Sequence, residues 1–261
     1  MSSSATATRP RPRWHGALAC RAPRDDAHVR LVCVPYAGGG PAAFRRWPDV
    51  LGDAIEVWTT TLPGRGGRVR EPFATEWAPL TSGLADSIAE HVREPIALYG
   101  HSMGALIAYE VAAVLEARGA DVRRLFVSAR CAPDVAAPVD CPDDDEVLLD
   151  RVDRLFGGVP SEIRADPELV QHFAAVLRAD LRLLERYRWA EHPPLTCPIT
   201  VLAGEDDETV SRPALDAWSR HTRAGAEVLV LPGGHFFLET QAAAVLDVVR
   251  ARTAQPQGAA P

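Results

Sequence analysis

Pro95-Ile96-Ala97-Leu98-Tyr99-Gly100-His101-Ser102-Met103-Gly104 is the stretch that decides the fold of this chain. Its apolar run ends at Tyr99 and a long helix-compatible stretch begins at Met103, so the turn between them joins a buried strand to a helix. A serine at the tip of so tight a turn has strained backbone geometry, and any side chain two residues to either side would meet the facing strand or helix. Glycine at positions 100 and 104 meets that requirement and leaves the Ser102 hydroxyl exposed.

Apolar, β-branched runs alternate with longer helical patterns on both sides of this turn. The predicted strands are residues 30–34, 55–60, 96–99, 125–128, 199–203 and 228–231. The predicted helices are residues 42–51, 80–92, 103–118, 212–221 and 242–252. Near-continuous apolar strands separated by helices indicate a mostly parallel sheet with helices on both faces. The predicted fold class is therefore α/β.

One segment, residues 130–194, breaks the alternation. No strand pattern appears there; an acidic, proline-rich loop at 140–146 is followed by helical patterns at 146–156 and 167–187. We expect this insertion to form a helical lid over the carboxyl edge of the sheet, where ligands bind in open α/β folds. The alternative is that these helices only cover the sheet. The main domain is predicted over residues 28–252, between disordered tails at 1–27 and 253–261.

Length and composition limit the class of protein. A chain of 261 residues suits one domain with a substantial core. The formal charge of −7 argues against nucleic-acid binding, which needs a basic face. No apolar run approaches the roughly 20 residues that span a bilayer, and the N-terminus lacks the apolar core of a secretory signal. Its arginine- and serine-rich start resembles a transit peptide, but disorder is the favoured interpretation. We predict a cytoplasmic location without membrane contact.

The metal-binding residue types show no ligand pattern. The five cysteines have no C-x-x-C spacing and an odd count, which indicates reduced thiols rather than disulfides or a zinc site. The eight histidines form no H-x-x-x-H cluster. The sequence therefore predicts no metal site.

The Ser102 hydroxyl becomes a nucleophile only if a histidine takes its proton and an acid orients that histidine. Asp207 follows the predicted strand 199–203, and His235 follows the strand 228–231 after two glycines. Each of the three residues lies at the carboxyl end of a strand, and the chain order Ser, Asp, His is that of α/β-hydrolases. We predict that Ser102, Asp207 and His235 are catalytic, although Glu205 and Asp206 beside Asp207 leave a solvated acidic loop as the alternative.

Backbone amides complete the predicted site. The segment Val34-Pro35-Tyr36-Ala37-Gly38-Gly39-Gly40 follows the first strong strand, and its glycines let amide groups approach a substrate oxygen. We expect the Ala37 and Met103 amides to form an oxyanion hole. No Gly-Lys-Ser/Thr follows, so a phosphate loop is excluded. His101 is expected to pack into the scaffold instead of taking part in the chemistry.

Several ordered motifs resemble the type II thioesterases, the discrete editing enzymes of polyketide synthases and nonribosomal peptide synthetases. The resemblance spans roughly residues 31–249 and rests on Pro35-Tyr36-Ala37-Gly38-Gly39, Leu62-Pro63-Gly64-Arg65, Gly100-His101-Ser102-Met103-Gly104, Leu177-Arg178-Ala179-Asp180 and Gly233-Gly234-His235-Phe236-Phe237-Leu238. It implies an α/β-hydrolase fold and hydrolysis of acyl groups from the phosphopantetheine arm of an acyl or peptidyl carrier protein. It also implies an acyl-enzyme on Ser102, no cofactor of the enzyme's own, and substrate contacts at Tyr36, Gly38 and Phe236. We expect a monomer.

The resemblance leaves some assignments open. Some related thioesterase domains place their acid in the loop that here contains Asp134, which makes it the rival of Asp207. Tyr36 stands where the family usually has histidine, and Gly66-Gly67 where it usually has charged residues; the first is expected to alter the pocket wall and the second to loosen the loop. Arg65 and Arg68 are weighed as a basic docking patch for an acidic carrier protein against plain solvated arginines. A stand-alone esterase or acyltransferase, and a non-catalytic interaction module, remain the alternative functions.

Overall fold

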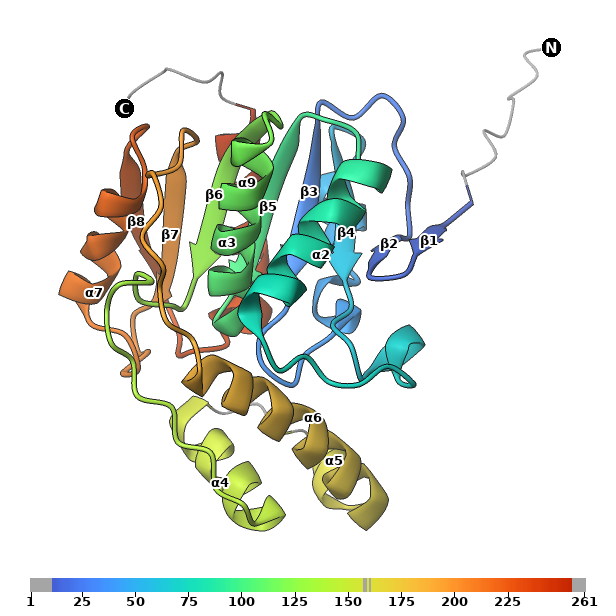
Figure 1. The fold of residues 1–261 in the computed structure, drawn as a ribbon, viewed down its shortest axis with the longest axis vertical. Coiled ribbons are helices and arrows are strands. Elements are labelled where there is room, and N and C mark those ends of the chain that lie inside the picture. The colour runs from blue at the N-terminus through green and yellow to red at the C-terminus, as the bar shows by residue number, and fades with distance from the viewer. Residues whose placement is uncertain (1–10, 157–158, 160, 255–261) are drawn as a thin grey trace.

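Eight strands form a single twisted sheet in the computed structural model, which describes residues 11–156, 159 and 161–254 (Figure 1). The strand order is β1-β2-β4-β3-β5-β6-β7-β8. The strands are β1 (Arg13–His15), β2 (Leu18–Cys20), β3 (Val29–Val34), β4 (Ile55–Thr60), β5 (Ile96–His101), β6 (Val122–Ser128), β7 (Ile199–Gly204) and β8 (Ala226–Leu231). β3 to β8 run parallel, and β1 and β2 add an antiparallel edge. The predicted mostly parallel sheet is confirmed.

Helices cover both faces of the sheet, as the alternating pattern predicted. The α-helices are α1 (Trp47–Leu51), α2 (Trp77–His91), α3 (Met103–Ala117), α4 (Asp145–Phe156), α5 (Ser161–Arg164), α6 (Pro167–Glu185), α7 (Arg212–Asp216), α8 (Phe237–Thr240) and α9 (Ala242–Thr253); the 3₁₀ helices are η1 (Pro41–Phe44), η2 (Gly66–Arg68) and η3 (Ala217–His221). One core packs α2, α3, α7 and η3 against the sheet, and a second packs α1, α8 and α9 against its other face. In the described part of the chain, no helix is both long and apolar enough to cross a membrane.

The prediction of a disordered tail over residues 1–27 is wrong from residue 13 onward. β1 and β2 form a hairpin whose second strand pairs with β4, Leu18 lying opposite Thr60. Leu18 and Cys20 are buried, so this edge of the sheet would be uncovered without the hairpin. Strands of three residues are too short to produce a readable alternation, which is why the sequence pattern missed them. Residues 1–10 and 255–261 of the predicted tails lie outside the described residues.

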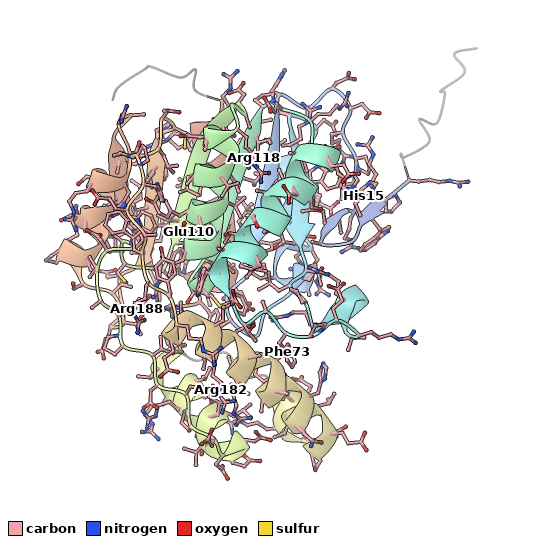
Figure 2. All side chains as sticks on the ribbon, in the orientation of Figure 1. His15, Phe73, Glu110, Arg118, Arg182 and Arg188 are labelled. Carbon is pink, nitrogen blue, oxygen red and sulfur yellow. The ribbon has the colours of Figure 1, made fainter. Side chains whose placement is uncertain are left out.

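The insertion at residues 130–194 contains α4, α5 and α6 and, among its described residues, no strand. Figure 1 shows these helices as a separate layer beyond the carboxyl ends of the parallel strands. They share a third hydrophobic core, whose fully enclosed members include Leu148, Ala174 and Leu177. Arg182 of α6, labelled in Figure 2, donates a 2.7 Å hydrogen bond to Asp143 in the segment that leads into α4. The predicted helices at 146–156 and 167–187 are thus confirmed.

Candidate active site

The strained turn predicted at Ser102 is present between β5 and α3. Ser102 has φ 55° and ψ −119°, a conformation that costs a non-glycine residue about 1–3 kcal/mol. A Cβ added to Gly100 would lie 2.0 Å from the carbonyl oxygen of Gly104. A Cβ on Gly104 would lie 2.3 and 2.5 Å from the carbonyl oxygens of Val34 and Pro35. Both glycines are therefore required, and the close approach at Gly104 brings the end of β3 against the serine turn.

Asp207 and His235 form a buried pair beside this turn. His235 Nδ1 lies 2.8 Å from Asp207 Oδ2, and each residue is 6 % exposed. Their loops follow β7 and β8, which lie side by side in the sheet. Gly204 makes the approach possible, because a Cβ there would lie 2.4 Å from the carbonyl oxygen of Gly233. The two residues separated by a helix and a strand in the sequence are thus brought into hydrogen-bond contact.

The second oxygen of Asp207 is held by Thr209. The Thr209 hydroxyl donates over 2.6 Å and its backbone amide over 3.1 Å to Asp207 Oδ1. Burial raises the pKa of Asp207, but the hydrogen bonds from His235 and Thr209 outweigh it and leave the pKa below its ordinary value of 3.8. Asp207 is thus ionised at neutral pH. Since a carboxylate only accepts hydrogen bonds, His235 carries its proton on Nδ1 and keeps Nε2 free to accept one.

The turn after β3 contains the predicted oxyanion donor Ala37. The Gly39 amide donates to the Tyr36 carbonyl over 2.9 Å, which closes a tight turn around Ala37 and Gly38. The Tyr36 ring packs edge-on against Phe236, with ring centres 4.7 Å apart, and its hydroxyl donates to Glu239. Met103, the other predicted donor, is the first residue of α3. The amide of a first helical residue has no acceptor within the helix, so it is available to a substrate oxygen.

A cavity of about 380 Å³ opens at these residues. Ser102, His235, Tyr36, Ala37 and Phe236 line it together. The rest of its wall is largely apolar and comes from the loop after β6, from the insertion helices and from the loop after β7; it includes Ala129, Cys131, Val135, Val139, Val152, Leu155, Phe156, Leu177, Leu181, Leu184 and Val210. Among the described residues no group of three or more histidine, cysteine or acidic side chains could hold a metal ion. The cavity suits an extended apolar group attached to a reactive carbonyl.

Gly38 and the two loop arginines differ from expectation. The Gly38 amide donates over 2.8 Å to Asp180 of α6, and Gly38 is not among the residues that line the cavity. Arg65 is 7 % exposed and forms an ion pair with Asp180, so it is neither the plain solvated arginine nor the docking residue that were weighed for this position. Arg68 pairs with Glu71 and donates to the Thr61 carbonyl, and it is only partly exposed. Arg65 is thus bound to α6, and Arg68 is bound within its own loop.

The two other candidate side chains are engaged elsewhere. His101 is completely buried, with Nδ1 2.9 Å from Ser128 Oγ, and burial lowers its pKa well below 6.5. The prediction that it packs into the scaffold is confirmed. Asp134, the rival acid, lies 2.9 Å from His221 Nε2 and 2.5 Å from Arg220. It therefore bonds to a different histidine, and Asp207 is the acid that contacts His235.

Thr209, Asp180 and Ser128 contribute to the site although sequence reasoning did not select them. Ser128 accepts the amide of Ser102 on its carbonyl oxygen over 2.8 Å and contacts His101 with its hydroxyl. Thr209 carries one weak signal, since an aspartate side chain often accepts the backbone amide of the residue two positions on, as Asp207 does from Thr209. Asp180 belongs to the motif Leu177-Arg178-Ala179-Asp180 that carries part of the family resemblance. Nothing in the sequence indicated that its partners are Gly38 and Arg65.

A parallel sheet with a strained serine turn, and an aspartate and a histidine on later loops at the same edge, defines the α/β-hydrolase class. The family model of the thioesterase domain matches residues 29–253. The chain belongs to this family, and it is a thioester hydrolase.

Individual relatives agree with the family. The chain is 34% identical to thioesterase PikA5 of Streptomyces venezuelae over 235 residues, which cover 84% of this chain and 79% of PikA5. Among solved structures, the thioesterase RedJ of the prodiginine pathway in Streptomyces coelicolor is 39% identical with a TM-score of 0.82, over 88% of this chain and 87% of RedJ. The type II thioesterase BorB from the borrelidin biosynthetic cluster is 30% identical, also with a TM-score of 0.82, over 91% and 97% of the two chains.

Proposed function

We propose that this enzyme hydrolyses acyl groups from the phosphopantetheine arm of acyl or peptidyl carrier proteins and so returns the free thiol to a stalled polyketide or nonribosomal peptide synthase. The names of BorB, a type II thioesterase, and RedJ, from a biosynthetic pathway, support this role. The observation that carries it is the shared cavity, in which Ser102 faces an apolar wall beside the hydrogen-bonded pair of His235 and Asp207.

Acylation begins at the serine. His235 Nε2 takes the proton of Ser102 Oγ as that oxygen attacks the thioester carbonyl. The amides of Ala37 and Met103 donate to the oxyanion, which is the step where preorganised donors contribute most. Asp207 holds the imidazole by Nδ1 and stabilises its positive charge. The tetrahedral intermediate then breaks its carbon–sulfur bond, and His235 returns the proton to the departing pantetheine thiolate.

Deacylation repeats the sequence with water. His235 Nε2 removes a proton from water, the resulting hydroxide attacks the ester carbonyl on Ser102, and the same two amides stabilise the second oxyanion. When the carbon–oxygen bond breaks, His235 protonates Ser102 Oγ and the free acid leaves. All atoms come from the substrate, water and the chain itself, so the reaction as written requires no cofactor.

The acyl group is assigned to the apolar cavity beneath the insertion, between Tyr36 and Phe236 at one end and the α4 and α6 side chains at the other. The helices at 130–194 thereby act as a lid over the acyl chain. We also propose a cytoplasmic monomer; the five free cysteines, all but Cys141 buried, support a reducing compartment.

Mass spectrometry of acyl-loaded carrier proteins tests this function. Wild type should remove the acyl group and leave the holo carrier with its thiol free, whereas Ser102→Ala should leave the acyl group in place. A parallel assay uses the same acyl group as a simple oxygen ester. If wild type leaves the loaded carrier unchanged while it cleaves the oxygen ester, the enzyme is a stand-alone esterase. If the acyl group moves to an added alcohol or amine faster than to water, it is an acyltransferase.

A further inference from the structure

A buried ion pair joins the insertion to the predicted oxyanion turn. Arg65 Nη1 and Nη2 donate over 2.6 and 2.5 Å to the two carboxylate oxygens of Asp180. Arg65 is 7 % and Asp180 4 % exposed. Their positions are far apart in sequence: Arg65 precedes η2 after β4, and Asp180 lies in the last third of α6. This geometry is the bidentate form that fixes direction as well as charge.

The pair clamps the turn after β3 at two successive residues. Asp180 Oδ2 accepts the Gly38 amide over 2.8 Å, and Arg65 Nη1 donates to the Gly39 carbonyl over 3.2 Å. Gly38 has φ 76°, and a Cβ there would lie 3.3 Å from Leu177 of α6. The peptide that follows Ala37 thus has its orientation set by α6, in a conformation that glycine adopts without strain.

Arg65 is itself held firmly enough to act as a support. The Gly64 amide donates to the Arg68 carbonyl over 3.0 Å, and the Arg68 amide donates to the Arg65 carbonyl over 2.8 Å. Gly64 has φ 83°, and the ring of Phe73, labelled in Figure 2, occupies the space where a Cβ would lie. The loop around Arg65 is therefore closed by its own hydrogen bonds and covered on one side.

A buried ion pair is poorly explained by stability alone. Removing two charges from water costs several kcal/mol per ion, and well-packed apolar residues often stabilise as much as the pair does. What the apolar alternative lacks is an acceptor for the Gly38 amide. The ion pair supplies that acceptor in a fixed position, next to the residue whose amide is assigned to the oxyanion.

We infer that Asp180 and Arg65 are positioning residues for catalysis: they hold the turn at Ala37 in the geometry that stabilises the oxyanion. The inference rests on the proposed roles of Ser102 and Ala37. Leu177, Leu181 and Leu184 of the same helix line the acyl cavity, so the helix that meets the acyl chain also sets the oxyanion turn.

Two double variants separate the effect of the Gly38 hydrogen bond to Asp180 from the effect of the Arg65–Asp180 ion pair. Arg65→Met/Asp180→Asn removes both charges but keeps an amide oxygen that accepts from Gly38. Arg65→Met/Asp180→Leu removes both charges and the acceptor. Their turnover is compared on a p-nitrophenyl acyl ester, so the result does not depend on carrier-protein recognition. Glu227→Gln/Arg252→Met, which removes a bidentate ion pair near the C-terminal end of α9, is the control for ion-pair loss as such.

We expect the Asn variant to lose no more than about tenfold in kcat, because it keeps the acceptor for the Gly38 amide but lacks the Arg65 bond to the Gly39 carbonyl. The Leu variant should lose about 100-fold in kcat with KM within about threefold, since a displacement near 1 Å has that effect on a catalytic group. Phosphonylation of Ser102 by a fluorophosphonate should slow in parallel, while unfolding temperatures of the two variants stay close. Equal kcat values for the Asn and Leu variants would overturn the inference. If the Leu variant does not fold, Arg65→Met/Asp180→Ala gives the same comparison, and exchange of the Gly38 amide in wild type as fast as that of Gly40 would also overturn it.

Discussion

Thr209 donates two hydrogen bonds to the Asp207 oxygen that His235 does not use. One carboxylate oxygen is thereby fixed by its own loop, and the other faces the imidazole. An acid held in this way orients the histidine with little freedom of its own, because both of its oxygens have partners.

Asp207→Asn should lower kcat by about 10⁴-fold, because an amide in this position favours the wrong tautomer of His235 and no longer stabilises the imidazolium. Steady-state hydrolysis of an acyl thioester measures the effect. Asp134→Asn is the matched control and should keep kcat within about twofold, since Asp134 contacts His221 and Arg220 instead. The opposite order, with the Asp134 variant inactive, would show that the acid has been misassigned.

Thr209→Val should lower kcat about tenfold, because a hydrogen bond to a charged group contributes about 1.5–3 kcal/mol and part of that orients Asp207. The valine has a similar shape but no hydroxyl. Thr209→Ser keeps the hydroxyl and should stay within about twofold of wild type. The pKa of Asp207 should rise in the valine variant, since the Thr209 hydroxyl lowers it. Equal activity of the valine and serine variants would contradict this role.

Replacement by alanine should have opposite effects on stability at Gly104 in the serine turn and at Gly83 in α2. Gly104→Ala should destabilise the protein by about 1–3 kcal/mol or more, because the new methyl group meets the Val34 and Pro35 carbonyls. Gly83→Ala, at an exposed position of α2 with no atom within 4 Å of the new Cβ, should stabilise it by about 0.5–1 kcal/mol. Urea unfolding of both variants measures the difference. A stable and fully active Gly104→Ala enzyme would be inconsistent with the turn described here.

The burial of His101 makes the stability of the fold depend on pH. Burial lowers its pKa in the folded state well below 6.5, so the unfolded chain binds a proton that the folded chain does not. The contribution of His101 to the unfolding free energy is therefore fully present above pH 6.5. It is lost on acidification, with a slope of up to about 1.4 kcal/mol per pH unit. His221, whose pKa burial also lowers, adds a slope of the same sign. His101→Asn should make the dependence of the unfolding free energy shallower between pH 6.5 and 5; an unchanged slope would show that His101 is not buried as a neutral group.

The long, periodic elements were predictable because each carries its own signal. The strand at Ile55–Thr60 was placed at its observed bounds, and the helix that begins at Met103 at its observed start. Catalytic candidates were predictable for a related reason: parallel strands bring their carboxyl ends to one edge, and Ser102, Asp207 and His235 each follow a predicted strand. The three-residue strands at Arg13–His15 and Leu18–Cys20 offered no comparable pattern.

Contacts between distant segments account for what could not be predicted. Arg65 looked like a surface arginine because nothing in its own loop indicates burial; its partner Asp180 is supplied by α6. The family resemblance implied a substrate contact at Gly38, yet its amide donates to the same aspartate. In both cases a tertiary contact with Asp180 of α6 occupies the group, the Arg65 guanidinium in one and the Gly38 amide in the other, and local sequence carries no sign of that contact.

Detection of the covalent acyl-enzyme tests most directly whether Ser102 is the nucleophile. Wild type is mixed with an excess of acyl-pantetheine thioester, quenched in acid during turnover, digested and examined by mass spectrometry. Nucleophilic attack by Ser102 predicts the acyl mass on the peptide that contains Ser102, and no acylated peptide from Ser102→Ala under the same conditions. Acylation of a different residue that lines the cavity, such as Cys131, or rapid turnover by Ser102→Ala, would contradict it.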